Sequence, residues 1–268
     1  AWTIPDSIST NCLVKITDTG DATVNDASNA AFKIQAAFTV TAPNGGEVWA
    51  IGGAQTIAWT TNGTVSFVRI DYSTDSGVTF PNAITTSTSN AGTYSWTVPD
   101  NVSGAVRVKV SQTPDAAAFD VSNGDSRIRA TFTLTAPNGG DQWRVGQVRN
   151  VTWSVIGTIP NVKLQYSRDI VTPFSTDVQL ITASTPSTGT YAWTIPDSIS
   201  DTVRVRVSDP NDIGALDDSN AAFRITGDFA VTAPNGGEQW IVATIQNITW
   251  TKTGSVTNAK IEYSTNSG

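Results

Sequence analysis

The sequence predicts an all-β protein, built as a tandem array of antiparallel β-sandwich domains joined by very short linkers. The first observation is repetition, because its nine tryptophans recur as three copies of one set of three. The second is the alternation of apolar and polar residues over short runs with turn residues between them, the pattern of half-buried strands. The third is that no stretch keeps a helical period.

The repeat is read from the spacing of the tryptophans. Trp49 and Trp143 are 94 positions apart, and Trp143 and Trp240 are 97 apart; each stands six residues after the proline of an identical Ala-Pro-Asn-Gly-Gly. A fixed period of this kind defines a repeated module. The predicted domains are 1–36 (the C-terminal part of a module), 37–130 and 131–227 (complete modules) and 228–268 (the N-terminal part of a module). Because the outer pieces are partial, we expect the chain to be a segment of a longer protein.

Six or seven short strands are expected in each module of about 95 residues. In residues 37–130 the inward-facing residues are, in chain order, Phe38 and Val40; Ile57 and Trp59; Val68, Ile70 and Tyr72; Tyr94, Trp96 and Val98; and Val106, Val108 and Val110. Pro43-Asn44-Gly45-Gly46 predicts a turn or bulge that redirects the first strand, and Pro99-Asp100 ends a later one. Strands of this number and spacing favour a two-sheet sandwich of immunoglobulin-like type.

The tryptophans divide into predicted core residues and candidate ligand contacts. Trp59 and Trp96 lie on faces that their neighbours mark as inward, so we assign them to the core. A second interpretation, stacking against a glycan, stays open for the set that follows the glycine turn: Trp49, Trp143 and Trp240. The single cysteine, Cys12, aligns with Val106 and Val203 and is predicted to be a small buried apolar residue.

Composition excludes several classes of function. The 268 residues include no histidine, so neither catalysis by an imidazole nor metal binding by an imidazole is possible. We predict that the chain is not an enzyme. With 16 basic and 23 acidic residues and a net charge of −7, the chain lacks the basic cluster that nucleic acid requires. No apolar run is long enough for membrane insertion. The abundance of Ser and Thr is typical of secreted and surface proteins, so we expect an extracellular or cell-surface location.

Two acidic positions recur in the loop region before the last strand of each module. They are Asp21, Asp115 and Asp212 at one position, and Asp26, Asp120 and Asp217 five residues later. Carboxylates with backbone carbonyls could bind Ca²⁺, which takes six to eight oxygen ligands, and calcium is the only cofactor the sequence suggests. The alternative is an ordinary loop in which these side chains cap local turns.

A third recurring motif follows the strand that ends at Tyr72. The run Ser73 to Phe80 resembles the Asp-box, Ser-x-Asp-x-Gly-x-Thr-aromatic, of sialidase-like propellers and other secreted β-proteins. The resemblance implies a hairpin turn held by Asp75, with no catalytic role. The counterparts are incomplete, because the run 167–174 around Asp169 and Ile170 lacks the glycine, and the run 264–268 has Asn266 in place of the aspartate.

The joints between modules are short. Ile34 and Phe38, Ile128 and Phe132, and Ile225 and Phe229 are each four residues apart, so the last strand of one module passes almost directly into the next. Such joints limit hinge motion. The predicted function is therefore structural or adhesive: a rod, stalk or fibre shaft whose first partners are the neighbouring modules. The partial end pieces also suggest self-association of chains into filaments.

These motifs together resemble a known kind of module. Pro-Asn-Gly-Gly-Glu-x-Trp, x-Ile-x-Trp, Tyr-Ser-Thr-Asp-Ser-Gly and Tyr-x-Trp-Thr-Val-Pro-Asp are similar to the Ig-like modules repeated in very large secreted or surface-exposed bacterial proteins. The first part is also similar to the Ig-like module of yeast cell-wall assembly and Ser/Thr-rich anchored proteins. The resemblance implies a cell-surface or extracellular array and supplies no catalytic residues. The alternative function is a set of carbohydrate-binding accessory modules of a secreted glycoside-active or cell-wall protein, with surface glycans as partners.

Overall fold

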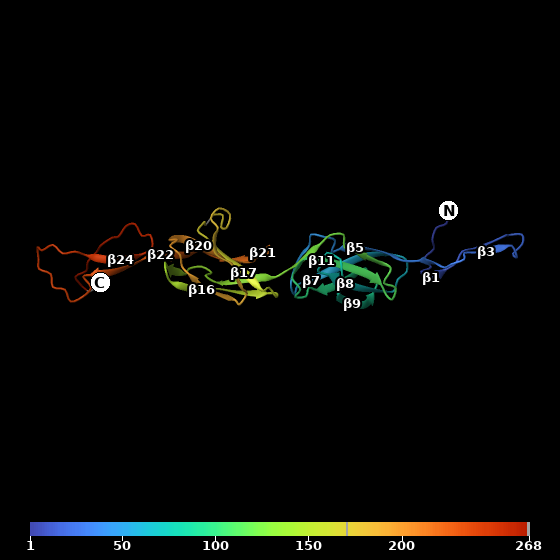
Figure 1. Ribbon diagram of the computed structural model, residues 1–268, viewed down its shortest axis with the longest axis horizontal. Coiled ribbons are helices and arrows are strands. Elements are labelled where there is room, and N and C mark those ends of the chain that lie inside the picture. The colour runs from blue at the N-terminus through green and yellow to red at the C-terminus, as the bar shows by residue number, and fades with distance from the viewer. Residues whose placement is uncertain (170, 267–268) are drawn as a thin grey trace. The chain divides into compact units, whose positions relative to one another are not determined.

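A computed structural model describes residues 1–169 and 171–266 of the chain (Figure 1). Ile170 of the second Asp-box-like run, and Ser267 and Gly268 of the third, lie outside the described residues. The chain divides into two compact units, Ala1–Arg129 and Ala130–Gly268, which are described separately. Within the described ranges every regular secondary-structure element is a β-strand. No helix there is long and apolar enough to cross a membrane.

Module 37–130 of the first unit is a two-sheet sandwich. One sheet has the order β10 (Thr93–Thr97), β7 (Ala54–Asn62), β5 (Ala37–Ala42). The other has the order β6 (Val48–Ala50), β13 (Ser126–Arg129), β11 (Ser103–Gln112), β8 (Phe67–Ser73), β9 (Asn82–Ser89), and β12 (Phe119–Val121) also pairs with β11. All pairs are antiparallel except β6 with β13. This topology confirms the predicted immunoglobulin-like sandwich.

The first strand changes sheets at the Pro-Asn-Gly-Gly turn, as the sequence predicts. β5 pairs with β7 until its register shifts between Val40 and Ala42, and β6 then pairs with β13 in the other sheet. Gly45 has a φ of +120°, and a Cβ on it would lie 2.7 Å from the Cα of Gly124, so this close approach requires glycine. The Glu47 carboxylate accepts hydrogen bonds from the amides of Asn44 (2.7 Å) and Gly45 (2.8 Å).

The core lies between the two sheets and is rich in aromatic rings. The predicted inward residues of β7, β8 and β11 are buried, and Ile57, Val68, Ile70, Val106, Val108 and Val110 have no exposed surface. Trp96 packs edge-on against Trp49 with ring centroids 5.4 Å apart, and against Tyr72 at 5.3 Å. Large rings fill the layer between the sheets, which confirms the core assignment of Trp59 and Trp96.

Module 131–227 of the second unit repeats this architecture. Its sheets have the orders β14-β16-β19 and β15-β22-β20-β17-β18, and β21 pairs with β20. The strands are β14 (Thr131–Ala136), β15 (Gln142–Arg144), β16 (Val148–Ile156), β17 (Asn161–Ser167), β18 (Gln179–Pro186), β19 (Thr190–Thr194), β20 (Ser200–Asp209), β21 (Asp212–Asp218) and β22 (Phe223–Thr226). Trp193 packs against Trp143 at 6.0 Å and Tyr166 at 5.2 Å, so the aromatic core is part of the repeat.

The outer pieces contribute only two-stranded ladders. In 1–36, β1 (Ser9–Cys12) pairs with β4 (Phe32–Ile34), and β2 (Lys15–Thr17) with β3 (Asn25–Ala27). In 228–268, β23 (Asp228–Ala233) pairs with β24 (Thr249–Thr253). The predicted burial of Cys12 is only partial, because its side chain is partly exposed. Its equivalents Val106 and Val203 are fully buried, since in their modules a second sheet covers this position.

Candidate functional site

The tryptophans that follow the glycine turns are core residues in both complete modules. Trp49 is 5% exposed and Trp143 is 6% exposed, because the parallel pairing of β6 with β13 and of β15 with β22 draws them into the sandwich. Little of either indole is therefore open to a ligand, whereas Trp240 is 46% exposed. The predicted glycan contact stays a prediction at all three residues.

The second recurring aspartate ties the two sheets of a module together. Asp120 lies on β12, and its Oδ2 accepts a hydrogen bond of 2.7 Å from the amide of Val40 on β5. In the next module, Asp217 on β21 accepts the same bond, also 2.7 Å, from Leu134 on β14. Asp26 lies on β3 opposite Ile16. Val40 and Leu134 each precede a register shift in the first strand of their module, β5 or β14. The carboxylate therefore accepts a hydrogen bond from a backbone amide where the ladder is irregular.

The first recurring aspartate caps a local turn. Asp21 accepts hydrogen bonds from the Thr23 amide (2.9 Å) and hydroxyl (2.6 Å). Asp115 accepts one from the Ala117 amide, and Asp212 one from the Gly214 amide, each at 3.1 Å. Among residues 1–169 and 171–266, acidic and cysteine side chains form no group of three or more that could hold a metal. Calcium binding at these aspartates stays a prediction, whereas their turn and strand contacts are structural.

The Asp-box run forms a turn held by Asp75, as the resemblance implies. The Asp75 carboxylate accepts hydrogen bonds from the Ser73 hydroxyl and from the Thr79 hydroxyl (2.6 Å) and amide (3.0 Å). These bonds, that from Ser73 first, lower the pKa of Asp75 from 3.8 to about 2. Asp169 has a lowered pKa for the same reason, mainly through the hydroxyls of Thr176 and Thr172. Both carboxylates are therefore occupied within their own loops.

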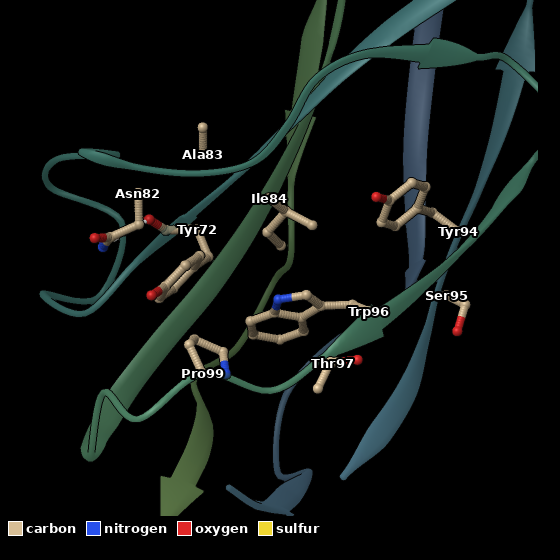
Figure 2. Close-up of a pocket in the computed structure, with 9 residues that line it drawn as sticks. All are labelled: Tyr72, Asn82, Ala83, Ile84, Tyr94, Ser95, Trp96, Thr97 and Pro99. Atoms are coloured by element: carbon tan, nitrogen blue, oxygen red, sulfur yellow. Dashed lines mark hydrogen bonds between the residues drawn. The ribbon is translucent and has the colours of Figure 1, made fainter. Parts of the chain in front are cut away.

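A pocket of about 520 Å³ opens in module 37–130 between the edge strands of the two sheets, β9 and β10 (Figure 2). Tyr72, Trp96 and Pro99 lie together on one side of it, and Ile84 and Tyr94 approach from above. The remaining lining residues are Asn82, Ala83, Ser95 and Thr97. None of the nine carries a carboxyl, amino or guanidinium group, so the pocket offers stacking and neutral hydrogen bonds and no acid–base pair.

The equivalent position in module 131–227 keeps the aromatic residues but has a larger side chain in place of one small residue. Tyr166, Tyr191 and Trp193 stand where Tyr72, Tyr94 and Trp96 stand in the first module, but Leu180 replaces Ala83. Sequence reasoning did not find the pocket, because its residues come from two sheet edges whose facing is a tertiary property.

Neither a protein-family model nor a curated protein matches the sequence. Solved structures with a similar arrangement include the fibronectin(III)-like modules of Clostridium thermocellum CbhA, 15% identical over 70% of this chain and 92% of that one, with a TM-score of 0.23. The N-terminal four Ig domains of Dscam1 isoform 8.4 are 9% identical over 75% and 51%, with a TM-score of 0.35. Rst D1-D2 is 8% identical over 70% and 98%, with a TM-score of 0.32. At these TM-scores the likenesses carry no argument, and the strand topology itself defines the fold.

Proposed function

We propose that the chain is a non-enzymatic structural or adhesive repeat array of a larger surface or secreted protein, and that it serves as a rod, stalk or fibre shaft. The observation that carries this proposal is the direct passage of strand into strand at the joints. β4 ends at Ile34 and β5 begins at Ala37; β22 ends at Thr226 and β23 begins at Asp228. Linkers this short leave few backbone torsions in which a hinge could form.

The side chains support a scaffold rather than a catalyst. The recurring carboxylates that would be candidates for acid–base work are engaged by backbone amides, as at Asp120 and Asp217. Repetition of the same unit also suits a spacer, because a catalytic site needs to be built only once. The acidic, Ser- and Thr-rich composition supports an extracellular or cell-surface setting.

Small-angle X-ray scattering tests the proposal on the full chain. The expected distance distribution is that of an elongated particle, with a long tail and a maximum dimension far above that of a globule of equal mass. A matched variant with a flexible Gly-Ser insertion between Gln35 and Ala36 should broaden the distribution. A compact profile for the unmodified chain would exclude a rod.

Carbohydrate binding is the second candidate function, and the pocket of Figure 2 is the observation that favours it. Its partly exposed Tyr94 ring and its neutral polar groups suit a sugar ring, which presents both C–H faces and hydroxyls. A glycan array should then give a signal that Ile84→Trp abolishes, because Ile84 points toward Trp96 in Figure 2 and a larger side chain there occludes the pocket. Ala183→Leu, at an exposed position outside the pocket in the other module, is the control. Unchanged binding by Ile84→Trp would exclude the pocket.

A further inference from the structure

A repeated contact joins the end of one module to the beginning of the next within each unit. In the first unit, Asp6 Oδ1 accepts a hydrogen bond of 2.9 Å from the Thr64 amide, and its Oδ2 accepts one of 2.6 Å from the Thr64 hydroxyl. In the second unit, Asp197 Oδ1 accepts a bond of 2.9 Å from the Ser255 amide, and its Oδ2 accepts one from the Ser255 hydroxyl. The same two-point contact is therefore built twice, from residues 58 positions apart each time.

The carboxylate is presented by a turn of fixed geometry, which we call the Pro-Asp turn (Pro5-Asp6 and Pro196-Asp197). The amide of Ser7 donates to the Pro5 carbonyl at 2.9 Å, and the amide of Ser198 donates to the Pro196 carbonyl at 2.8 Å. Both aspartates have a lowered pKa, with the hydroxyl of Thr64 or Ser255 as the largest cause. The charged carboxylate is thus the form that the contact favours.

The receiving element is also a turn, which we call the Gly-Thr/Ser turn (Gly63-Thr64 and Gly254-Ser255). Gly63 has a φ of +104° and Gly254 a φ of +87°, a region that favours glycine. A Cβ would lie 3.4 Å from the Asp6 carboxylate at Gly63, and 3.3 Å from the Asp197 carboxylate at Gly254. Glycine therefore lets the backbone approach the carboxylate closely enough for its neighbour's amide to bind.

An apolar contact accompanies each carboxylate. The side chain two residues after the aspartate is Ile8 in the first unit and Ile199 in the second, and each has its Cδ1 3.3 Å from where the turn glycine's Cβ would be. Ile8 packs against the core of module 37–130. The second joint adds an ion pair of 2.9 Å between Arg144 and Asp228. Each joint thus combines a two-point hydrogen bond with packing, as a specific interface does.

We propose that the Pro5-Asp6 and Pro196-Asp197 turns are docking sites for the Gly-Thr/Ser turn of the module that follows, and that this contact fixes the angle between the two modules. The partner is thus the next repeat of this chain, recognised by a glycine followed by a hydroxyl residue. The sequence contains the pair of motifs a third time, as Pro99-Asp100 and Gly157-Thr158. The proposal rests on the proposed function, because a spacer needs defined angles between its modules.

Pulsed electron–electron double resonance, which measures the distance between two spin labels, tests the contact on the full chain. Cys12→Val removes the native thiol, and spin labels at Ala183→Cys and Thr251→Cys, both exposed positions, report across the second joint. Asp197→Ala should broaden the distance distribution about twofold, because the joint loses both hydrogen bonds and keeps only its packing and short linker. Ser255→Thr should keep it narrow, since Thr64 fills this role in the first joint.

The control variant is Asp201→Ala, which removes the same charge from an ion pair with Arg224 inside one module. It should leave the distribution unchanged, and amide exchange in β23 and β24 should show that these strands stay paired in every variant. An equal distribution for Asp197→Ala and Asp201→Ala would overturn the proposal. Failure of the proposed rod function would appear separately. The unmodified chain would then give a compact scattering profile even though the distance distribution across this joint is narrow.

Discussion

The two complete modules differ at one hydrogen bond beneath a core tryptophan, and exchanging the residue responsible gives a sharp prediction. In module 37–130 the Trp59 indole Nε1 donates to Asn90 Oδ1 at 2.7 Å. Asn90 also accepts from the Thr61 hydroxyl (3.1 Å) and donates to the Val65 carbonyl (3.1 Å). In module 131–227 the equivalent residue is Ser187, and among the described residues neither Ser187 Oγ nor Trp153 Nε1, both buried, has a partner.

The backbone is placed alike at the two positions, so the missing bond is a matter of side-chain length. The amide of Asn90 donates to the Ser66 carbonyl and that of Ser187 to the Pro160 carbonyl, each at 3.0 Å. An intramolecular hydrogen bond contributes about 0.5–1.5 kcal/mol, and a buried polar group without a partner costs about 1–3 kcal/mol. Ser187→Asn should therefore raise the free energy of unfolding of module 131–227 by about 1–2 kcal/mol, after the cost of ordering the longer side chain.

Urea unfolding read by peptide-resolved hydrogen exchange measures each module separately, with amides of β16 and β20 reporting on one and those of β7 and β11 on the other. The reverse change, Asn90→Ser, should destabilise module 37–130 by about 1–3 kcal/mol. A double-mutant cycle of Ser187→Asn with Trp153→Phe should give a coupling of about 1 kcal/mol, because the bond needs both partners. Unchanged exchange in Ser187→Asn, together with zero coupling, would show that this hydrogen bond does not form or does not stabilise the module.

Three further predictions concern the core, the bridging aspartate and the Asp-box turn. Trp49→Ala should destabilise module 37–130 by about 3–5 kcal/mol in urea unfolding, because it empties a buried aromatic position. Asp120→Ala should cost about 1–2 kcal/mol in the same assay, since the Val40 amide loses its acceptor; a calcium site there would instead appear as a fall in melting temperature on adding EDTA. The pKa of Asp75, lowered to about 2, means that its stabilising contribution is complete above about pH 4 and is lost as the pH falls through about 2, which carboxyl NMR titration measures.

Each of these predictions has a control. Phe67→Ala, at a residue 53% exposed, should change stability by less than about 0.5 kcal/mol, and an equally small effect of Trp49→Ala would contradict its place in the core. Asp217→Ala should reproduce the loss seen for Asp120→Ala, in the other module. Asp75→Asn should flatten the acid limb of the stability curve, and an unaltered limb would show that other carboxyls set it.

Much of the fold is predictable because its signals are local. Alternation along β8 and β11 marks the buried face, since successive side chains of a strand point to opposite sides. The change of sheet at Pro43 is predictable from proline and glycine torsions. β9 is not, because Asn82–Ser89 is rich in Thr and Ser and carries little apolar signal. It becomes a strand through pairing with β8, and a Thr85 hydroxyl bond to the Ser87 carbonyl (3.1 Å) lies in its irregular part.

The spacing of its repeats makes the period of the module readable from the sequence. The strands with a clear apolar face and the turns that end them are readable too, because these depend on neighbours within a few residues. The depth of Trp49, the partner of Asp120 and the contact between Asp6 and Thr64 follow only from the three-dimensional fold, since each joins residues distant along the chain. The sequence shows whether a side chain is apolar or charged. The partner that satisfies it is set by which strands and turns the fold brings together.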